Sequence, residues 1–200
     1  QSTQGAFGYV DLTWHSNAPT LNHSNLRLLQ LNPTSDDELH GFAQARKSEG
    51  IKYDWVLNCT GFLSGNFGSP EKRIADIDPE FFIENMRVNS LPTLLIAKHF
   101  SQLINDDLNS ETPAIFAVIS AKVGSISDNR LGGWYSYRAS KAALNMAIKT
   151  LSIEWQRRYK KRCVVALHPG TTQSPLSKPF STHVPPEKYF TAEQTADYLI

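Results

Sequence analysis

The sequence predicts an α/β domain with a doubly wound parallel sheet covered by helices, and three observations support this. Apolar runs at residues 55–57, 114–119 and 163–167 do not alternate with polar residues, which is typical of strands buried on both faces. Longer segments with apolar residues three and four positions apart, typical of amphipathic helices, separate these runs. Strands that alternate with helices in this way form a parallel sheet.

The first elements are defined by capping residues. Residues 1–24 are polar and predict irregular structure, with a short hairpin or helix as alternatives. Residues 25–31 form a strand candidate. Ser35 is a suitable N-cap for the next helix, and Glu38 three residues later completes a capping box. Gly50 is a typical stop for this helix.

A long helix is expected from Asp78 to about Ile104. Asp78 is a favoured N-cap, and Pro79 occupies the first helical position, where its missing N–H costs nothing. Pro92 lies inside this helix. Because proline clashes with the carbonyl four residues earlier, we expect a distortion near Asn89.

The other elements follow the same alternation of strands and helices. In chain order we expect a strand at 53–59, a glycine-, serine- and proline-rich loop at 60–76, a strand at 114–120, a helix at 135–159, a strand at 163–167, a proline-rich flap at 169–190 and a helix from Thr191.

Tyr137 and Lys141 are one helical turn apart, so both side chains project from one face of the predicted helix. An unperturbed tyrosine has a pKa of about 10, and a nearby cation lowers that pKa. A Tyr/Lys pair on a helix surface is common and has no function in most cases. This pair, however, follows the carboxyl end of the strand at 114–120, where open α/β sheets bind their ligands.

With this context, the pair resembles the Y-x-x-x-K signature of the short-chain dehydrogenase/reductase family. Residues 58–61 resemble the N-N-A-G motif of the family, and residues 169–174 resemble its P-G-x-V-x-T segment. Asn89 falls where the family has an active-site asparagine. The resemblance extends from about Leu26 to the end of the chain, with the motifs in the family's order and spacing.

The resemblance implies a Rossmann-type fold and hydride transfer between NAD(P)(H) and a carbonyl or alcohol substrate. It implies that Tyr137 donates or accepts the proton and that Lys141 lowers the tyrosine pKa and binds the nicotinamide ribose. Asn89 would help to hold a water that links Lys141 to solvent. Residues 124–126 and 132–137 resemble the C-factor branch of carbonyl reductase-like members, which favours NADP over the alternative, NAD.

The catalytic serine is where this sequence departs from the family. The family's strand typically ends S-S-x-x-G with the second serine catalytic, and Ala121 stands at that position here. Ser120 is the favoured replacement and Ser125 is the alternative. Loss of the hydroxyl would cost about a hundredfold or more in rate. A family-like binding or signalling protein with weak or no catalysis is therefore the second interpretation.

The resemblance also assigns the contacts with the cofactor. Asn32 would contact the adenine. The residues expected to bind the rest of the cofactor are Asn58, Thr60, Gly61, Tyr137, Lys141, Pro169, Gly170, Thr172 and Ser174.

We interpret residues 1–200 as a single NAD(P)-binding Rossmann-type domain. The family's first β-α-β unit carries a T-G-x-x-x-G-x-G loop that binds the cofactor pyrophosphate, and the sequence contains no such loop. The last ten residues have the pattern of a helix that is still continuing. We therefore expect a chain that is shortened at both ends and lacks this first unit.

Composition favours an ordinary soluble protein. The formal net charge of +1 gives no reason to expect nucleic-acid or membrane partners, and the scattered histidines predict no metal site. Cys59 and Cys163 are expected to be small buried residues, and a reducing cytoplasm is the simplest setting for them. The resemblance implies a homodimer or homotetramer. The few charges of the flap favour a small, neutral or apolar carbonyl substrate or the matching alcohol.

Overall fold

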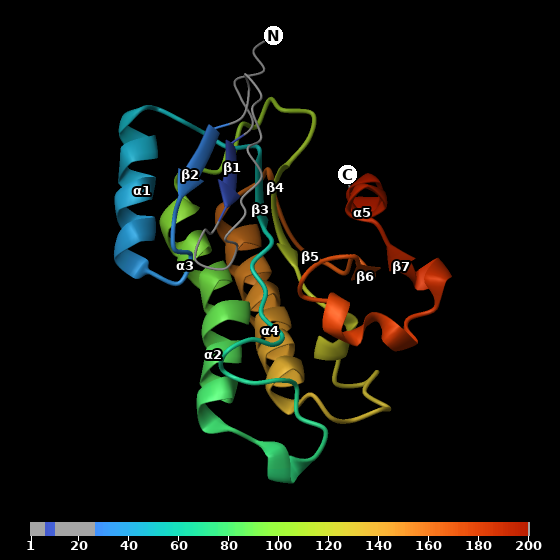
Figure 1. Cartoon of the computed structure of the whole chain (residues 1–200). Helices are drawn as coiled ribbons and strands as arrows, with labels where there is room; N and C mark the ends of the chain where they lie inside the picture. The colour runs from blue at the N-terminus through green and yellow to red at the C-terminus, as the bar shows by residue number, and fades with distance from the viewer. Residues whose placement is uncertain (1–6, 11–26, 200) are drawn as a thin grey trace.

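A computed structural model describes residues 7–10 and 27–199 of the chain, and Figure 1 shows how their elements are arranged. In chain order these are β1 (Phe7–Val10), β2 (Arg27–Gln30), α1 (Asp36–Ser48), β3 (Trp55–Asn58), α2 (Pro79–Asn89), α3 (Leu91–Phe100), β4 (Ala114–Ile119), α4 (Tyr135–Arg158), β5 (Arg162–Leu167), β6 (Thr171–Thr172), β7 (Tyr189–Phe190) and α5 (Ala192–Leu199). Short 3-10 turns lie at Ile74–Asp76, Lys122–Gly124, Lys178–His183 and Pro186–Lys188.

All the strand pairs are parallel, as the sequence predicts. They form the ladders β3–β4–β5, β1–β2 and β6–β7. The strand β1 corrects one expectation, because residues 7–10 pair with β2 in parallel and are neither irregular nor part of a hairpin. The rest of that prediction, at 1–6 and 11–24, lies outside the described residues.

The core lies between one face of the β3–β4–β5 sheet and the helices α1, α3 and α4. Val56 and Phe116 are paired in register on this face, and Leu144 of α4 is fully buried against it. The Phe116 ring packs on Trp155 of α4 with the ring centres 5.5 Å apart. This packing accounts for the apolar residues on one face of the strands, and the expectation that helices cover both faces is not met in the described residues.

The opposite face of the sheet explains why the expectation for the cysteines is wrong. Trp55 and Leu57 point to this face and are 52% and 47% exposed. Cys163 shares the face, since it is paired with Ile115 in register, and it is exposed. Cys59, directly after β3, is exposed as well.

Local capping residues begin α1 and α2 as predicted. Ser35 Oγ accepts a hydrogen bond from the Glu38 N–H at 3.3 Å. The capping box is incomplete, because the Glu38 carboxylate accepts from the Asn32 N–H at 2.9 Å. Asp78 Oδ1 accepts from the Phe81 N–H at 2.8 Å.

The predicted long helix is interrupted between α2 and α3. The helix α2 ends at Asn89 and α3 begins at Leu91, with Pro92 in its first turn. Ser90 between them uses its hydroxyl to bond the Ser140 carbonyl of α4 at 2.7 Å. The break therefore lies where proline was expected to cause one, and it is fastened to α4. Within residues 7–10 and 27–199, no helix has the length and apolar character needed to span a membrane.

Candidate active site

The predicted Tyr/Lys pair lies on the buried face of α4, at the carboxyl edge of β4. Tyr137 and Lys141 are 8% and 2% exposed. Lys141 Nζ lies 5.8 Å from the centre of the Tyr137 ring and donates a hydrogen bond to the Ile119 carbonyl at 3.1 Å. An ammonium has three N–H donors, so two remain after this bond. The pair occupies the sheet edge at which α/β domains bind ligands.

Burial shifts both pKa values. It raises the pKa of Tyr137 from its ordinary value of 10.0 to about 12 and lowers the pKa of Lys141 from 10.5 to about 8. In each case removal from water disfavours the charged form. The lowered Tyr137 pKa expected from the sequence is therefore not found in this structure, in which burial raises the pKa. Lys141, by contrast, changes its charge close to neutral pH.

Asn89 joins three parts of the site. It is 1% exposed, and its Oδ1 accepts from the Phe62 N–H at 2.7 Å while its Nδ2 donates to the Phe62 carbonyl at 2.9 Å. The same Nδ2 lies 3.0 Å from Ser140 Oγ and 3.2 Å from Asn85 Oδ1. Ser140 Oγ in turn donates to the Tyr137 carbonyl at 2.8 Å. The loop after β3, the end of α2 and the start of α4 are thus held together.

Asn58 fixes the end of β3. Its Nδ2 donates to Thr93 Oγ1 of α3 at 2.9 Å, and its Oδ1 accepts from the Thr60 N–H and hydroxyl at 3.0 and 2.8 Å. Gly61 follows, and an added Cβ would meet Leu176 of the flap at 3.5 Å and Asn89 Oδ1 at 4.0 Å. These bonds hold the end of β3 against α3, and Gly61 lies next to Leu176 of the flap.

The hydroxyls of the two candidate serines are bonded to groups other than Tyr137 and Lys141. Ser120 Oγ donates to Asn145 Oδ1 at 2.6 Å, one turn beyond Lys141 on α4. Ser125 Oγ accepts from the Asp128 N–H at 3.4 Å. Within the described part of the chain, neither hydroxyl is bonded to Tyr137. Whether Ser120 or Ser125 replaces the serine missing at Ala121 stays a prediction.

Gly124, next to these serines, lies directly against α4. An added Cβ would be 2.7 Å from the Lys141 carbonyl carbon, so only glycine fits there.

The segment after β5 carries the residues predicted to face the nicotinamide. Pro169 ends the strand, and Gly170 has a φ of 75°. A Cβ on Gly170 would be 2.7 Å from the Phe190 ring, so glycine is required at this bend. Thr172 Oγ1 lies 2.8 Å from Thr195 Oγ1 of α5.

The remaining predicted contacts lie at the two ends of the site. Ser174 Oγ is 3.4 Å from Ser177 Oγ inside the flap. Asn32 follows β2, and its Oδ1 accepts from the Thr34 N–H and hydroxyl at 3.0 and 2.8 Å. Asn32 thus belongs to the β1–β2 strand pair, apart from the cluster around Tyr137.

Sequence reasoning missed the residue that caps α4. The carboxylate of Glu71, in the loop between β3 and α2, accepts from the Ser136 N–H at 3.2 Å and from the Ser136 hydroxyl through a short hydrogen bond. These residues are 65 positions apart, so no local pattern connects them. The glycine pair before Trp134 was the one signal of an unusual turn.

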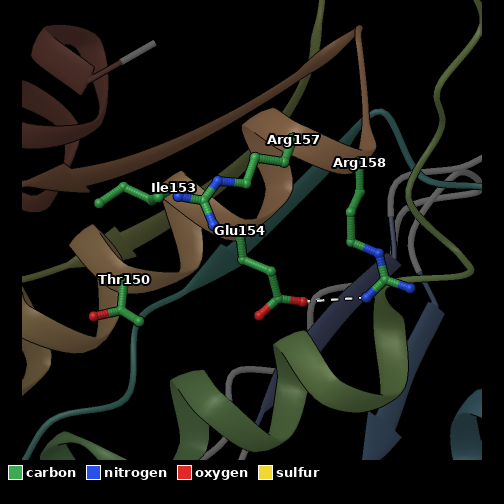
Figure 2. A pocket seen from close by; sticks show the side chains of 5 residues that line it. All are labelled: Thr150, Ile153, Glu154, Arg157 and Arg158. Carbon is green, nitrogen blue, oxygen red and sulfur yellow. Dashed lines mark hydrogen bonds and ion pairs between the residues drawn. The ribbon is translucent and has the colours of Figure 1, made fainter.

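Figure 2 shows a hollow formed by exposed residues of α4. It is lined by Thr150, Ile153, Glu154, Arg157 and Arg158. Arg158 and Glu154 form an exposed ion pair of 3.2 Å across it. At a rise of about 1.5 Å per residue, even Thr150 is about 20 Å along the helix from Tyr137. The hollow is not part of the candidate active site.

The architecture defines a class: a Rossmann-like α/β domain with polar groups gathered at the carboxyl ends of parallel strands. A family model described as enoyl-(acyl carrier protein) reductase matches residues 9–197. The chain therefore belongs to the short-chain dehydrogenase/reductase family, as its motifs predicted.

The relatives agree with this assignment. A 1-hydroxy-2-glutathionyl-2-methyl-3-butene dehydrogenase of Rhodococcus sp. (strain AD45) is 30% identical over 167 residues, which cover 84% of this chain and 66% of that protein. The C-signal of Myxococcus xanthus is 39% identical over 71 residues, 36% of this chain and 42% of that protein. The chain thus spans less than two thirds of the length of these curated relatives.

Solved structures show the same fold. The crystal structure of NADPH-bound carbonyl reductase from chicken fatty liver superimposes with a TM-score of 0.78 at 22% identity, covering 97% of this chain and 74% of that chain. The fold class predicted from the sequence is confirmed by this similarity.

Proposed function

We propose that this protein transfers a hydride between NADP(H) and a small carbonyl or alcohol substrate, with Tyr137 as the proton donor and acceptor. The observation that carries the proposal is the buried Tyr137–Lys141 pair at the carboxyl edge of β4. Family membership and the NADPH-bound structural neighbour support it. NAD is the alternative cofactor.

The site has features that suit a nicotinamide nucleotide. Lys141 keeps two N–H donors for ribose hydroxyls beyond its bond to Ile119. Gly61 presents backbone without a side chain, next to the ordered Asn58 and Thr60. Pro169, Gly170, Thr172 and Ser174 would lie at the nicotinamide end, and Asn32 at the adenine end.

The proton step follows from the environment of Tyr137. When bound, a reduced nicotinamide would be the source of hydride for the carbonyl carbon. The Tyr137 hydroxyl then gives its proton to the carbonyl oxygen, which leaves an alcohol and a phenolate. Because burial disfavours this phenolate, the positive charge of Lys141 is needed to stabilise it. Asn89 bonds the hydroxyl of Ser140, which in turn bonds the Tyr137 carbonyl. Asn89 would also help to hold a water that links Lys141 to solvent.

Nucleotide binding and turnover test this function directly. NADPH and NADH are titrated by nucleotide fluorescence, and NADPH oxidation is then followed with a panel of neutral carbonyl compounds. We expect binding, with tighter binding of NADPH, and turnover that is lost in Tyr137→Phe. Absence of binding to either nucleotide would contradict the proposal.

A second candidate function is a family-like binding or signalling protein with weak catalysis. It is favoured by one observation: Ala121 replaces the expected serine, and the Ser120 hydroxyl is bonded to Asn145. Substituting Ala121→Ser separates the two candidates. An enzyme that lacks its oxyanion donor should gain rate, whereas a binding protein should show no turnover in either form.

We further propose that the protein is a cytoplasmic homodimer or homotetramer. Ile83 and Leu94, on the helices α2 and α3, are 63% and 46% exposed, and Met146 on α4 is 67% exposed. Association between copies of the chain would remove these apolar side chains from water. Light scattering after size exclusion measures the mass, and a monomer at micromolar concentration would contradict this part. The exposed free thiols of Cys59 and Cys163 suit a reducing compartment.

A further inference from the structure

The turn that leads into α4 has an unusual backbone. Gly132, Gly133 and Trp134 all have left-handed φ values, of 65°, 63° and 53°. Among the residues at 7–10 and 27–199, Trp134 is the only non-glycine residue with a positive φ. A bulky side chain is disfavoured in this region and persists only when its surroundings hold it.

Glu71 provides this hold from the loop between β3 and α2. Its side chain is 3% exposed, and its carbonyl accepts the Trp134 N–H at 2.5 Å. Its carboxylate accepts both the N–H and the hydroxyl of Ser136, in the first turn of α4. Trp134 offers no side-chain cap of its own, so the buried carboxyl group of Glu71 caps the helix by accepting from Ser136.

The Trp134 ring lies between the proton donor and the flap. Its centre is 6.2 Å from the Tyr137 ring and 5.2 Å from the Phe180 ring, with edge-to-face geometry in both cases. Trp134 and Phe180 are both half-buried, so neither residue is fully enclosed by the protein. The two rings form an apolar wall next to Tyr137.

We propose that Glu71 is a positioning residue that holds Trp134, and that Trp134 is a specificity-determining residue which favours carbonyl compounds with an aryl substituent. An aryl ring packs edge-to-face or offset on tryptophan and phenylalanine, whereas a short alkyl group gains little there. The preference for aryl substrates rests on the proposed function, but the role of Glu71 does not.

Tryptophan fluorescence tests the role of Glu71 without substrate or cofactor. The chain has four tryptophans, so the Trp134 signal is obtained by subtracting the signal of the matched Trp134→Phe variant. We expect Glu71→Ala to raise acrylamide quenching of Trp134 about twofold, because the turn is released. Glu71→Gln, which keeps an acceptor for the Ser136 N–H, should restore most of the protection. Unchanged quenching in Glu71→Ala, with the protein folded by circular dichroism, overturns this role.

Kinetics with paired substrates test the role of Trp134. We expect Trp134→Gly to lower the ratio of kcat/KM for an aryl ketone to that for a short alkyl ketone about tenfold, chiefly through KM. Glu71→Ala should lower the same ratio, and it should add nothing to it in the Trp134→Gly background. Should Glu71→Ala fail to fold, Ser136→Ala removes the hydroxyl donor alone and should lower the ratio less.

The outcomes are distinguishable. An aryl-to-alkyl ratio that is unchanged in Trp134→Gly overturns the specificity role. A wild-type protein without turnover on any carbonyl refutes the proposed function and the aryl preference with it. The quenching measurement still decides on Glu71 in that case.

Discussion

The helices α2 and α4 pack against each other and both line the candidate site, yet they begin in different ways. The helix α2 is capped by Asp78, whose carboxylate accepts an N–H three residues later. The helix α4 has no side-chain cap at Trp134 and depends on Glu71, 65 positions before Ser136. The start of α2 is thus set by a local contact, whereas the turn before Tyr137 is fixed by contacts between residues that are distant in the sequence.

The largest effect is expected when the hydroxyl of Tyr137, at the start of α4, is removed. Tyr137→Phe should lower kcat/KM for carbonyl reduction about 10²- to 10⁴-fold, because the proton donor is lost while the ring stays in place. The melting temperature should change little. Tyr135→Phe is the matched control, since Tyr135 is 39% exposed on the same turn. Equal activity of Tyr137→Phe and Tyr135→Phe would show that the Tyr137 hydroxyl takes no part in the reaction.

A substitution at the end of α2 should lower the stability of the protein. Asn89→Ala removes two hydrogen bonds to the Phe62 backbone in a buried site. We expect a loss of about 2–4 kcal/mol in the free energy of unfolding, measured by urea denaturation. Asn109→Ala, on an exposed loop, should change it by less than about 0.5 kcal/mol. A loss of activity without loss of stability would instead make Asn89 part of the chemistry.

The pH dependence should report Lys141. Because its pKa is lowered to about 8, the rate of carbonyl reduction should fall as pH rises through that value and the ammonium is lost. Lys141→Arg keeps a charge at all these pH values, so this limb should disappear from its kcat/KM profile. A limb that persists in Lys141→Arg would assign it to another group.

The same shift predicts a change in stability. An unfolded lysine keeps its proton up to its ordinary pKa of 10.5, whereas the folded one releases it from about 8. The unfolded state binds more protons between these values, so this group makes the free energy of unfolding rise with pH there. Above pH 10 the raised Tyr137 pKa acts in the opposite direction, up to about 12. Urea denaturation from pH 7.5 to 9.5 should show the rise, and Lys141→Met should abolish it.

The smallest effect concerns the local cap of α2. Asp78→Ala should cost about 1 kcal/mol, because one backbone donor in the first turn loses its acceptor. Asp78→Asn keeps an acceptor and should lose much less. Both are measured by thermal unfolding, and a loss above that of Asn89→Ala would show that the start of α2 is not a local feature.

The elements of the fold were predictable because their signals are local. Ser35, Asp78 and Pro92 act on neighbours within four residues, and helix starts and the helix break lie where they indicate. Cys163 was predicted wrongly because an apolar strand does not reveal which of its faces a helix covers. The strand β1 was missed because its partner β2 is distant in the sequence.

The sequence predicted which residues form the candidate site better than it predicted their burial and hydrogen-bond partners. Spacing placed Tyr137 and Lys141 on one helix face, but it could not show that burial raises the tyrosine pKa. Nor could it show that Asn89 bonds Phe62, since these contacts connect residues 27 positions apart. The contact of Glu71 with Ser136 could not be predicted for the same reason, since these residues are 65 positions apart.

The flap is tied at both of its ends. Thr171 pairs with Tyr189 and Thr172 with Phe190, and the Gln173 N–H donates to the Phe190 carbonyl at 2.8 Å. The chain thus leaves and re-enters the domain at one point, and residues 173–188 form a loop closed at its base by this strand pair. Doubling the length of such a loop costs only about 0.6 kcal/mol. A longer or shorter segment between these two anchor points would therefore leave the Tyr137–Lys141 pair in place at little cost in stability.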